Sequence, residues 1–313
     1  MTTSFQGANQ GNTPDSRPEA HLEPIKAIPL RHPWRNAISV LLLLLVGSFI
    51  YDASHRKIYD WATYKEFLFY PRILKGIVVT LELTALSMLI AIALGIVLAV
   101  MRQSPNPILK SVSWTFIWFF RGTPVYVQLV FWGLLSTVYP SITLGIPFVG
   151  DFATFGSLNN VSLFSLAVIG LALNEAAYMA EIVRAGLISV DRGQEEASKA
   201  LGMGWALSMR RIIIPQAMRI IIPPTGNEVI SMLKTTSLVT AIPLTLDLYM
   251  ASRDISSATY KPVPLLLVAS TWYLVFTSVL MVLQYFLEKR FARGYAQMGL
   301  DVKANPLEGT GAG

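Results

Sequence analysis

The chain has 313 residues and a net charge of +6; 53% of its residues are hydrophobic and 14% are charged. This balance lies outside the range of soluble globular proteins and predicts an integral membrane protein. The sequence has no cysteine, which excludes disulfides and cysteine-based metal clusters, and its histidines (His21, His32 and His55) all lie in polar segments near the N-terminus. We therefore expect no metal site in this chain.

Polar segments surround the first hydrophobic stretch. Residues 1–33 are polar and rich in proline, and we expect them to form a disordered cytoplasmic tail. The segment from Asn36 to Ala53 could be mistaken for a cleaved signal peptide, but the tail before it favours a retained anchor helix over residues 34–53. Residues 54–75 form a connecting segment, and residues 291–313 form a second polar tail, also expected to be disordered and cytoplasmic.

Five more hydrophobic segments follow along the chain. They run from Gly76 to Met101, Val112 to Tyr139, Val161 to Leu187, Ile212 to Leu246 and Pro262 to Leu287. Each approaches or exceeds the ~20 residues that a helix needs to cross a bilayer, so we expect an all-α protein with about six transmembrane helices. The third and fifth segments of the chain are too long for one simple helix, and both contain helix breakers. The breakers are Gly122 and Pro124 in the third and Pro215, Pro223, Pro224 and Gly226 in the fifth, where we expect kinks or discontinuities.

The distribution of lysine and arginine predicts the orientation. Residues 140–160 contain neither, whereas residues 102–110, 184–219 and 289–293 are basic. Because basic loops stay in the cytoplasm, both termini and the loop after the fourth segment are predicted to be cytoplasmic. The positive charges therefore orient the chain and do not indicate nucleic-acid binding. Residues 54–75 are placed outside by this scheme although they carry five basic residues, which opposes the rule.

A polar stretch rich in small residues lies between the fourth and fifth segments. Gly193 precedes a short predicted helix, Glu195 and Glu196 lie in its first turn, Lys199 lies near its end and Gly202 follows it. These charges suit the helix dipole, and Glu195 can pair with Lys199. A helix this short is marginal alone in water. We therefore interpret it as a docking element, with an ordinary interfacial linker helix as the alternative.

Several motifs resemble one family of transport proteins. The pattern Glu196-Ala197-Ser198, Gly202 and Ile212-x-Ile214-Pro215 resembles the EAA-type cytoplasmic loop of ABC importer permeases. Three further motifs resemble the polar amino acid branch of that family: FFRGTP at 119–124, NEAAYMAEIVRAG at 174–186 and KTTSL at 234–238. The resemblance covers about residues 70–290. Two positions depart from the loop pattern, since Ser198 stands where alanine is usual and Ile214 where leucine is usual.

This resemblance implies a function and a set of partners. It implies a five-helix permease core at residues 76–290, a coupling loop at residues 188–211, and an extra N-terminal helix. Such a permease pairs with a second one, identical or homologous, while cytoplasmic ATPase subunits grip the loop helix and an external solute-binding protein delivers a polar amino acid. We expect import across a bacterial inner membrane by alternating access, with ATP bound by the partner and no cofactor here. The expected ATPase-coupling residues are Gly193, Glu195, Glu196, Ala197, Ser198, Leu201 and Gly202.

The source of energy separates this function from its alternatives. The sequence has no GxxxxGK[ST] loop, so it cannot hold nucleotide phosphates in the P-loop manner and the energy must come from a partner. An ion-coupled secondary amino acid transporter is the main alternative; it would need ion-coupling carboxylates and usually inverted repeats, but not the docking loop. An enzyme is disfavoured because HExxH and GxSxG motifs are missing.

Polar residues within the hydrophobic segments mark a candidate substrate path. A charge at the bilayer centre costs at least ~2.5–3.5 kcal/mol, so such residues usually face a cavity or a partner. The candidates are Asn174, Glu175, Tyr178, Glu181, Glu228, Lys234, Thr235 and Thr236. Asn174, Tyr178 and Glu181 share one helical face, although Glu181 could instead pair with Arg184. Lys234 could meet a substrate carboxylate, or extend to the outer interface.

Overall fold

The computed structural model describes residues 33–139, 141–146, 150–157, 160–244 and 246–292. The two predicted tails lie almost wholly outside these residues. The chain divides after His55 into two units, which are described separately. The first contains α1 (Pro33–His55), a helix whose leucines are exposed along its length, Leu43 by 71%. A helix that is apolar on every side suits a membrane span, as predicted for this segment.

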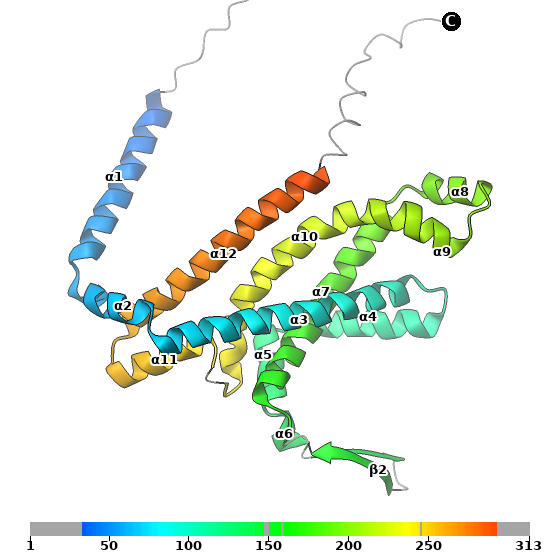
Figure 1. Cartoon of the computed structure of the whole chain (residues 1–313), viewed down its shortest axis with the longest axis horizontal. Coiled ribbons are helices and arrows are strands. Elements are labelled where there is room, and N and C mark those ends of the chain that lie inside the picture. Colours follow the sequence, from blue (N-terminus) through cyan, green and yellow to red (C-terminus); the bar gives the residue numbers. More distant parts are fainter. Residues whose placement is uncertain (1–32, 140, 147–149, 158–159, 245, 293–313) are drawn as a thin grey trace, which may run out of the picture. The chain divides into compact units, whose positions relative to one another are not determined.

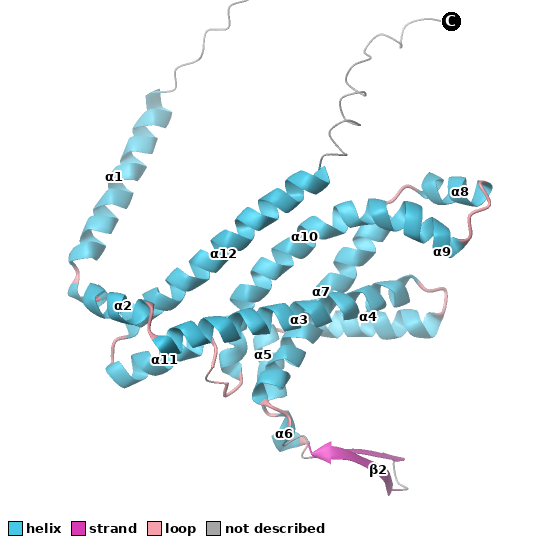
Figure 2. Ribbon diagram, in the orientation of Figure 1, coloured by secondary structure: helices cyan, strands magenta, loops and turns pink. Residues whose placement is uncertain are grey.

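The second unit is built almost entirely of helices (Figure 1, Figure 2). Its elements are η1 (Lys57–Tyr59), α2 (Trp61–Leu68), α3 (Pro71–Gln103), α4 (Pro107–Gly122), α5 (Val125–Gly133), α6 (Leu135–Val138), β1 (Ser141–Ile146), β2 (Gly150–Ser157), α7 (Leu163–Ile188), α8 (Arg192–Ala200), α9 (Trp205–Ser208), the π-helix η3 (Met209–Ile213), α10 (Ile214–Thr235), η4 (Thr236–Ala241), α11 (Leu248–Thr259) and α12 (Pro262–Ala292). Among the described residues, α1, α3, α7 and α12 are long and apolar enough to cross a membrane. The helical fold is confirmed, but the count of six single spans is not.

The third segment is divided at its predicted breakers, whereas the fifth changes helix type along its length and is not interrupted at Pro223, Pro224 or Gly226. α4 ends at Gly122 and α5 starts at Val125, with Pro124 at the N-cap, because proline has no N–H to continue the first helix. In the fifth segment the helix type changes at both ends of α10, to a π-helix before Ile214 and to a 3₁₀ helix after Thr235. Pro223 and Pro224 lie inside α10 and do not end it.

The connection between α6 and α7 contains a two-stranded hairpin, which the all-helical prediction did not include. β1 and β2 pair antiparallel, with Ser141 opposite Ser157 and Ile146 opposite Gly150. The two strand sequences, SITLGI and GDFATFGS, are rich in β-branched and aromatic residues, which explains the local preference for strands.

α3 and α7 form the centre of this unit and pack against each other more extensively than any other helix pair. One apolar core lies along their contact with α10 and includes Leu83, Leu171 and Met179, which are almost fully buried. A second core lies where α3 meets α11 and α12 and includes Ile73 and Leu265. The helices approach closely at Gly95, where an added Cβ atom would lie 2.6 Å from the Cβ atom of Met179.

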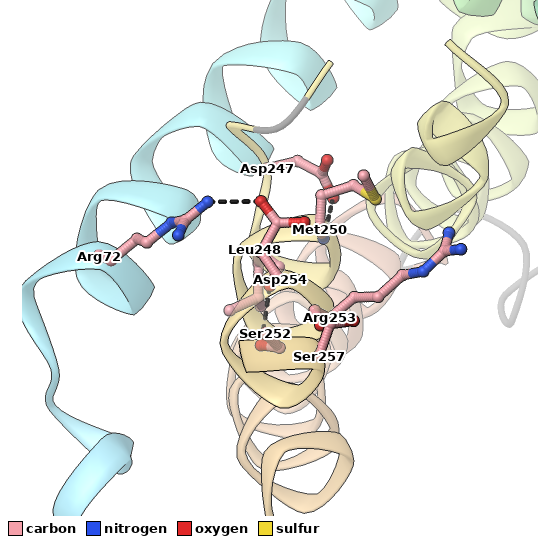
Figure 3. Close-up of polar contacts among 8 residues, drawn as sticks. All are labelled: Arg72, Asp247, Leu248, Met250, Ser252, Arg253, Asp254 and Ser257. Atoms are coloured by element: carbon pink, nitrogen blue, oxygen red, sulfur yellow. Dashed lines mark hydrogen bonds and ion pairs between the residues drawn. The ribbon is translucent and has the colours of Figure 1, made fainter. Parts of the chain in front are cut away.

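Residues 54–75, whose basic side chains oppose the predicted orientation, are linked to other parts of the unit by ion pairs. Arg72 at the start of α3 pairs with Asp254 of α11 (Figure 3). Lys261 binds the carboxylate of Asp60 at 2.8 Å. Asp247, shown in the same view, caps α11 by accepting hydrogen bonds from the backbone N–H groups of residues 249 and 250. Part of the positive charge of residues 54–75 is thus neutralised by an acidic side chain on α11.

The Asp60 contact predicts a pH dependence of stability. Its hydrogen bond from Lys261, followed by those from Thr63, lowers the pKa of Asp60 from 3.8 to about 2. Because the folded-state pKa is depressed, the contribution to stability is present above pH 3.8 and is lost as the pH falls through about 2. In Lys261→Ala we expect the pKa of Asp60 to rise toward 3.8, as measured by NMR titration of labelled aspartate. An unchanged pKa would show that Thr63 alone holds it.

Candidate functional site

The coupling loop contains the predicted short helix. α8 begins at Arg192, slightly earlier than predicted, because the carboxylate of Asp191 caps it by accepting a hydrogen bond from the Gly193 N–H at 2.6 Å. The predicted pair between Glu195 and Lys199 is present, with 2.7 Å between the carboxylate and ammonium groups. The hydrogen bond from Lys199 lowers the pKa of Glu195, so this carboxylate stays charged at neutral pH.

Gly202 ends α8 with a specific turn. Its φ is +74°, its N–H donates to the Lys199 carbonyl, and the Met203 N–H donates to the Ser198 carbonyl. This pair of bonds is a Schellman motif, which satisfies the last carbonyls of the helix and needs a left-handed residue at this position. A side chain at position 202 would strain the turn, so the predicted importance of Gly202 has a conformational basis.

The outer surface of the loop combines acidic, small and apolar groups. Glu196 and Ala197 are exposed on α8, and Leu201 is 79% exposed just after it. Trp205, the first residue of α9, is 74% exposed. Trp205 was not among the predicted residues. A tryptophan next to a short polar docking motif could have been identified from the sequence as a candidate contact residue. Two large apolar side chains are thus exposed on a polar loop, which is typical of an interaction surface.

Ser198 is the exception among the predicted coupling residues, because its side chain is fully buried. It turns away from the outer surface toward α9. A hollow of about 690 Å³ lies under the loop, between it and the ends of α3 and α7. Its lining includes Gln103, Pro105, Leu187, Arg192 and Trp205.

A second candidate site is a pocket of about 270 Å³ between α5, α7 and α10. Its lining residues are Val125, Leu171, Asn174, Glu175, Tyr178, Glu228, Ser231, Met232 and Thr235. Most of the predicted substrate-path residues therefore come together here, from helices that are distant in sequence. Ser231 was missed, although it lies one turn before Thr235 on the same face of α10.

Two carboxyl groups dominate the chemistry of this pocket. Glu175 is only 7% exposed, and its Oε1 atom has no hydrogen-bond partner among the described residues. Glu228 on α10 lines the same pocket as Glu175 on α7. Two carboxyl groups in one pocket repel each other when both are charged, and a positive group between them relieves that repulsion. The pair is therefore suited to a cationic ligand group.

Asn174 and Gln128 brace the break between α4 and α5. The Asn174 amide donates to the Phe120 carbonyl at 3.0 Å and to the Gln128 side-chain oxygen at 3.2 Å. The Gln128 amide in turn donates to the carbonyls of Phe120 and Thr123. These bonds satisfy carbonyl groups that the end of α4 leaves without helical partners. Gln128 was not predicted, and no local pattern marks it.

The same break places a positive charge near the pocket. The Arg121 guanidinium lies 5.1 Å above the ring centre of Tyr178, which lines the pocket. Its position over an aromatic ring is typical of a cation–π contact.

The remaining predicted residues do not line this pocket. Glu181 forms a salt bridge with Arg184 at 2.6 Å, which was the alternative considered for it. Lys234 is exposed on the last turn of α10, and Thr236 is buried with its hydroxyl donated to the Leu233 carbonyl. Within the described part of the chain, no cluster of His, Asp and Glu side chains is arranged to hold a metal ion.

Comparison with known proteins gives consistent matches. The chain is 56% identical over 275 residues to the arginine transport system permease protein of Corynebacterium glutamicum. This match covers 88% of this chain and 85% of the relative. It is 37% identical to the histidine/lysine/arginine/ornithine transport system permease protein of Escherichia coli K12, over 69% of this chain and 87% of the relative. A crystal structure of an amino acid ABC transporter with histidines matches with a TM-score of 0.60 and 35% identity, over 70% of this chain and 94% of that one.

These relatives are permease subunits and not enzymes, and they give no support to the ion-coupled alternative. Residues 91–293 match the family described as "Binding-protein-dependent transport system inner membrane component". Members of this family work with ATP-binding and solute-binding partners. The chain therefore belongs to the family of inner membrane components of binding-protein-dependent transport systems, as a multi-pass permease subunit.

Proposed function

We propose that this chain is the permease of an ATP-driven importer for a cationic amino acid such as arginine. The observation that carries this proposal is the Glu175–Glu228 pair, which offers two carboxyl groups to one positive group inside the membrane. The names of the relatives from C. glutamicum and E. coli, which specify arginine and other basic amino acids, support the same substrate class.

The pocket also suggests how the substrate is oriented. In our proposal the cationic side chain lies between Glu175 and Glu228, and the α-carboxylate lies toward Arg121, beyond the ring of Tyr178. Opposite charges at the two ends match the charge pattern of arginine or lysine. Lys234, the residue that the sequence suggested for the carboxylate, is less suitable because it does not line the pocket.

The coupling loop transmits energy from the ATPase subunit to the spans in this proposal. Glu196, Ala197, Leu201 and Trp205 form the surface gripped by a cytoplasmic ATPase subunit, which binds the ATP, so this chain itself needs no cofactor. Closure of the ATPase dimer moves the loop as a rigid body and tilts the spans, which gives alternating access. A second permease subunit, identical or homologous, completes the pore, and an external binding protein delivers the substrate. Both termini of the chain lie in the cytoplasm in this arrangement.

The test is ATP hydrolysis and labelled arginine uptake in proteoliposomes that contain this chain with its ATPase and binding protein. We expect the wild type to import arginine only with ATP. Glu196→Lys combined with Gly202→Asp should abolish uptake, because it reverses one docking charge and strains the turn after α8, while arginine binding is retained. Glu66→Lys, a charge reversal on the exposed side of α2, is the matched control. Uptake that needs no ATP and tolerates the double substitution would contradict the proposal.

A further inference from the structure

Two buried serine hydroxyls join the two arms of the coupling loop. The Oγ atoms of Ser198 on α8 and Ser208 on α9 lie 2.6 Å apart, and the two residues are 0% and 5% exposed. Ser198 Oγ also lies 2.7 Å from the Glu195 carbonyl, to which it donates its only proton. With that proton donated to the Glu195 carbonyl, Ser198 accepts from Ser208, so the hydrogen bonds run from α9 to α8.

The link is mechanically important because Ser208 leads directly into a long helix. Ser208 is the last residue of α9, and the chain continues through η3 into α10 without an intervening loop. A second contact joins α8 to α10, since the Gln216 amide donates to the Gln194 side-chain oxygen at 3.3 Å. α8 is therefore held at two points along one continuous helical path that leads into the membrane.

We propose that Ser198 and Ser208 are positioning residues that make α8, α9 and the start of α10 one lever. This inference rests on the proposed coupling function of the loop. The hydroxyl pair sets the orientation of α8 on α10, so that force applied to the exposed face of α8 turns α10 and does not fold the loop on itself. Alanine is usual at position 198 in the loop pattern that this chain resembles. The hydroxyl link is thus a feature of this sequence beyond the shared pattern.

The first test uses the absence of cysteine from the chain, which makes Ser198→Cys with Ser208→Cys a clean two-thiol variant. The close approach of the two hydroxyls should allow a disulfide to form on oxidation. Because the two arms move together in our proposal, the cross-linked protein should import at least as much arginine per ATP hydrolysed as its reduced form, which lacks the hydroxyl pair. Uptake that is lost on oxidation and restored by a reductant would show that the arms must move apart, and would overturn the lever.

The second test uses alanine variants and the ratio of arginine imported to ATP hydrolysed. Ser198→Ala leaves the buried Ser208 hydroxyl without its partner, so this ratio should fall about three- to tenfold with the KM for arginine unchanged. Adding Ser208→Ala should cause no further loss, since both substitutions remove the same bond. Ser189→Ala is the matched control, because the Ser189 hydroxyl bonds to the Gly186 carbonyl within its own turn.

The outcomes distinguish this inference from the function on which it rests. A wild-type complex without ATP-driven uptake would contradict the proposed function. A wild-type complex that couples normally, with serine variants that keep the wild-type ratio of arginine imported to ATP hydrolysed, would contradict only the lever. Additive losses of this ratio in the two serine variants would contradict it as well.

Discussion

Replacement of Glu175 by glutamine is expected to weaken arginine binding by the permease at least about 30-fold, because truncating one partner of a buried charge pair costs about 2–5 kcal/mol. The folded protein should be as stable as the wild type or more so. Glu175 is almost fully buried, with one carboxylate oxygen that lacks a partner among the described residues, and a neutral amide costs less to bury than a carboxylate. Opposite effects on binding and stability are the signature of a ligand site.

Binding should be measured with labelled arginine on the permease–ATPase complex in detergent, without the binding protein. This arrangement excludes selection by the binding protein, and thermal unfolding of the same sample gives the stability. Glu228→Gln should weaken binding in the same direction, whereas Glu66→Gln, on the exposed side of α2, should change neither quantity. Unchanged affinity in Glu175→Gln, or a large loss of stability with it, would assign the carboxylate a structural role.

The second large effect is expected at Gly95, where Gly95→Ala should destabilise the complex by about 1–3 kcal/mol through overpacking. The new Cβ atom would lie 2.6 Å from the Cβ atom of Met179 and 3.1 Å from the Ala180 backbone nitrogen. A backbone atom cannot move aside as a flexible side chain does, so α3 and α7 would have to separate. Met179 also lies beside Tyr178, so this separation should weaken arginine binding as well.

The measurement is the thermal unfolding midpoint of the purified complex in detergent. A loss of about 1–3 kcal/mol corresponds to a fall of several degrees, at about 2–4 °C per kcal/mol for a domain of this size. Gly47→Ala in α1 is the matched control, since nothing lies within 4 Å of its added Cβ atom. Equal midpoints for both variants would show that the α3–α7 contact is looser than the structure indicates.

Local signals in the sequence predicted the parts of the structure that depend on neighbouring residues. The break between α4 and α5 follows from Gly122 and Pro124, and the end of α8 follows from Gly202, because these residues restrict the backbone by themselves. The pocket was predicted in part. Intramembrane charge marked Glu175 and Glu228 as functional candidates, although their proximity could not be read from positions so far apart in the chain.

The features that were missed depend on contacts between distant segments. Gln128 and Asn174 are 46 residues apart and meet only because α5 packs on α7. Ser198 and Ser208 meet because the turn at Gly202 folds α9 back along α8. No periodicity within one helix marks either pair. The position of Lys234 outside the pocket likewise depends on the rotation of α10 about its axis, which tertiary packing decides.

The bracing role of Asn174 has a consequence for which substrates are rejected. An amide nitrogen has two protons, and both Asn174 protons are donated to the protein, to the Phe120 carbonyl and to Gln128. Thr235 likewise donates its hydroxyl proton to the Ser231 carbonyl. In the proposed substrate pocket, an acidic side chain placed beside Glu175 and Glu228 would meet two like charges. We therefore expect acidic amino acids to be disfavoured on electrostatic grounds.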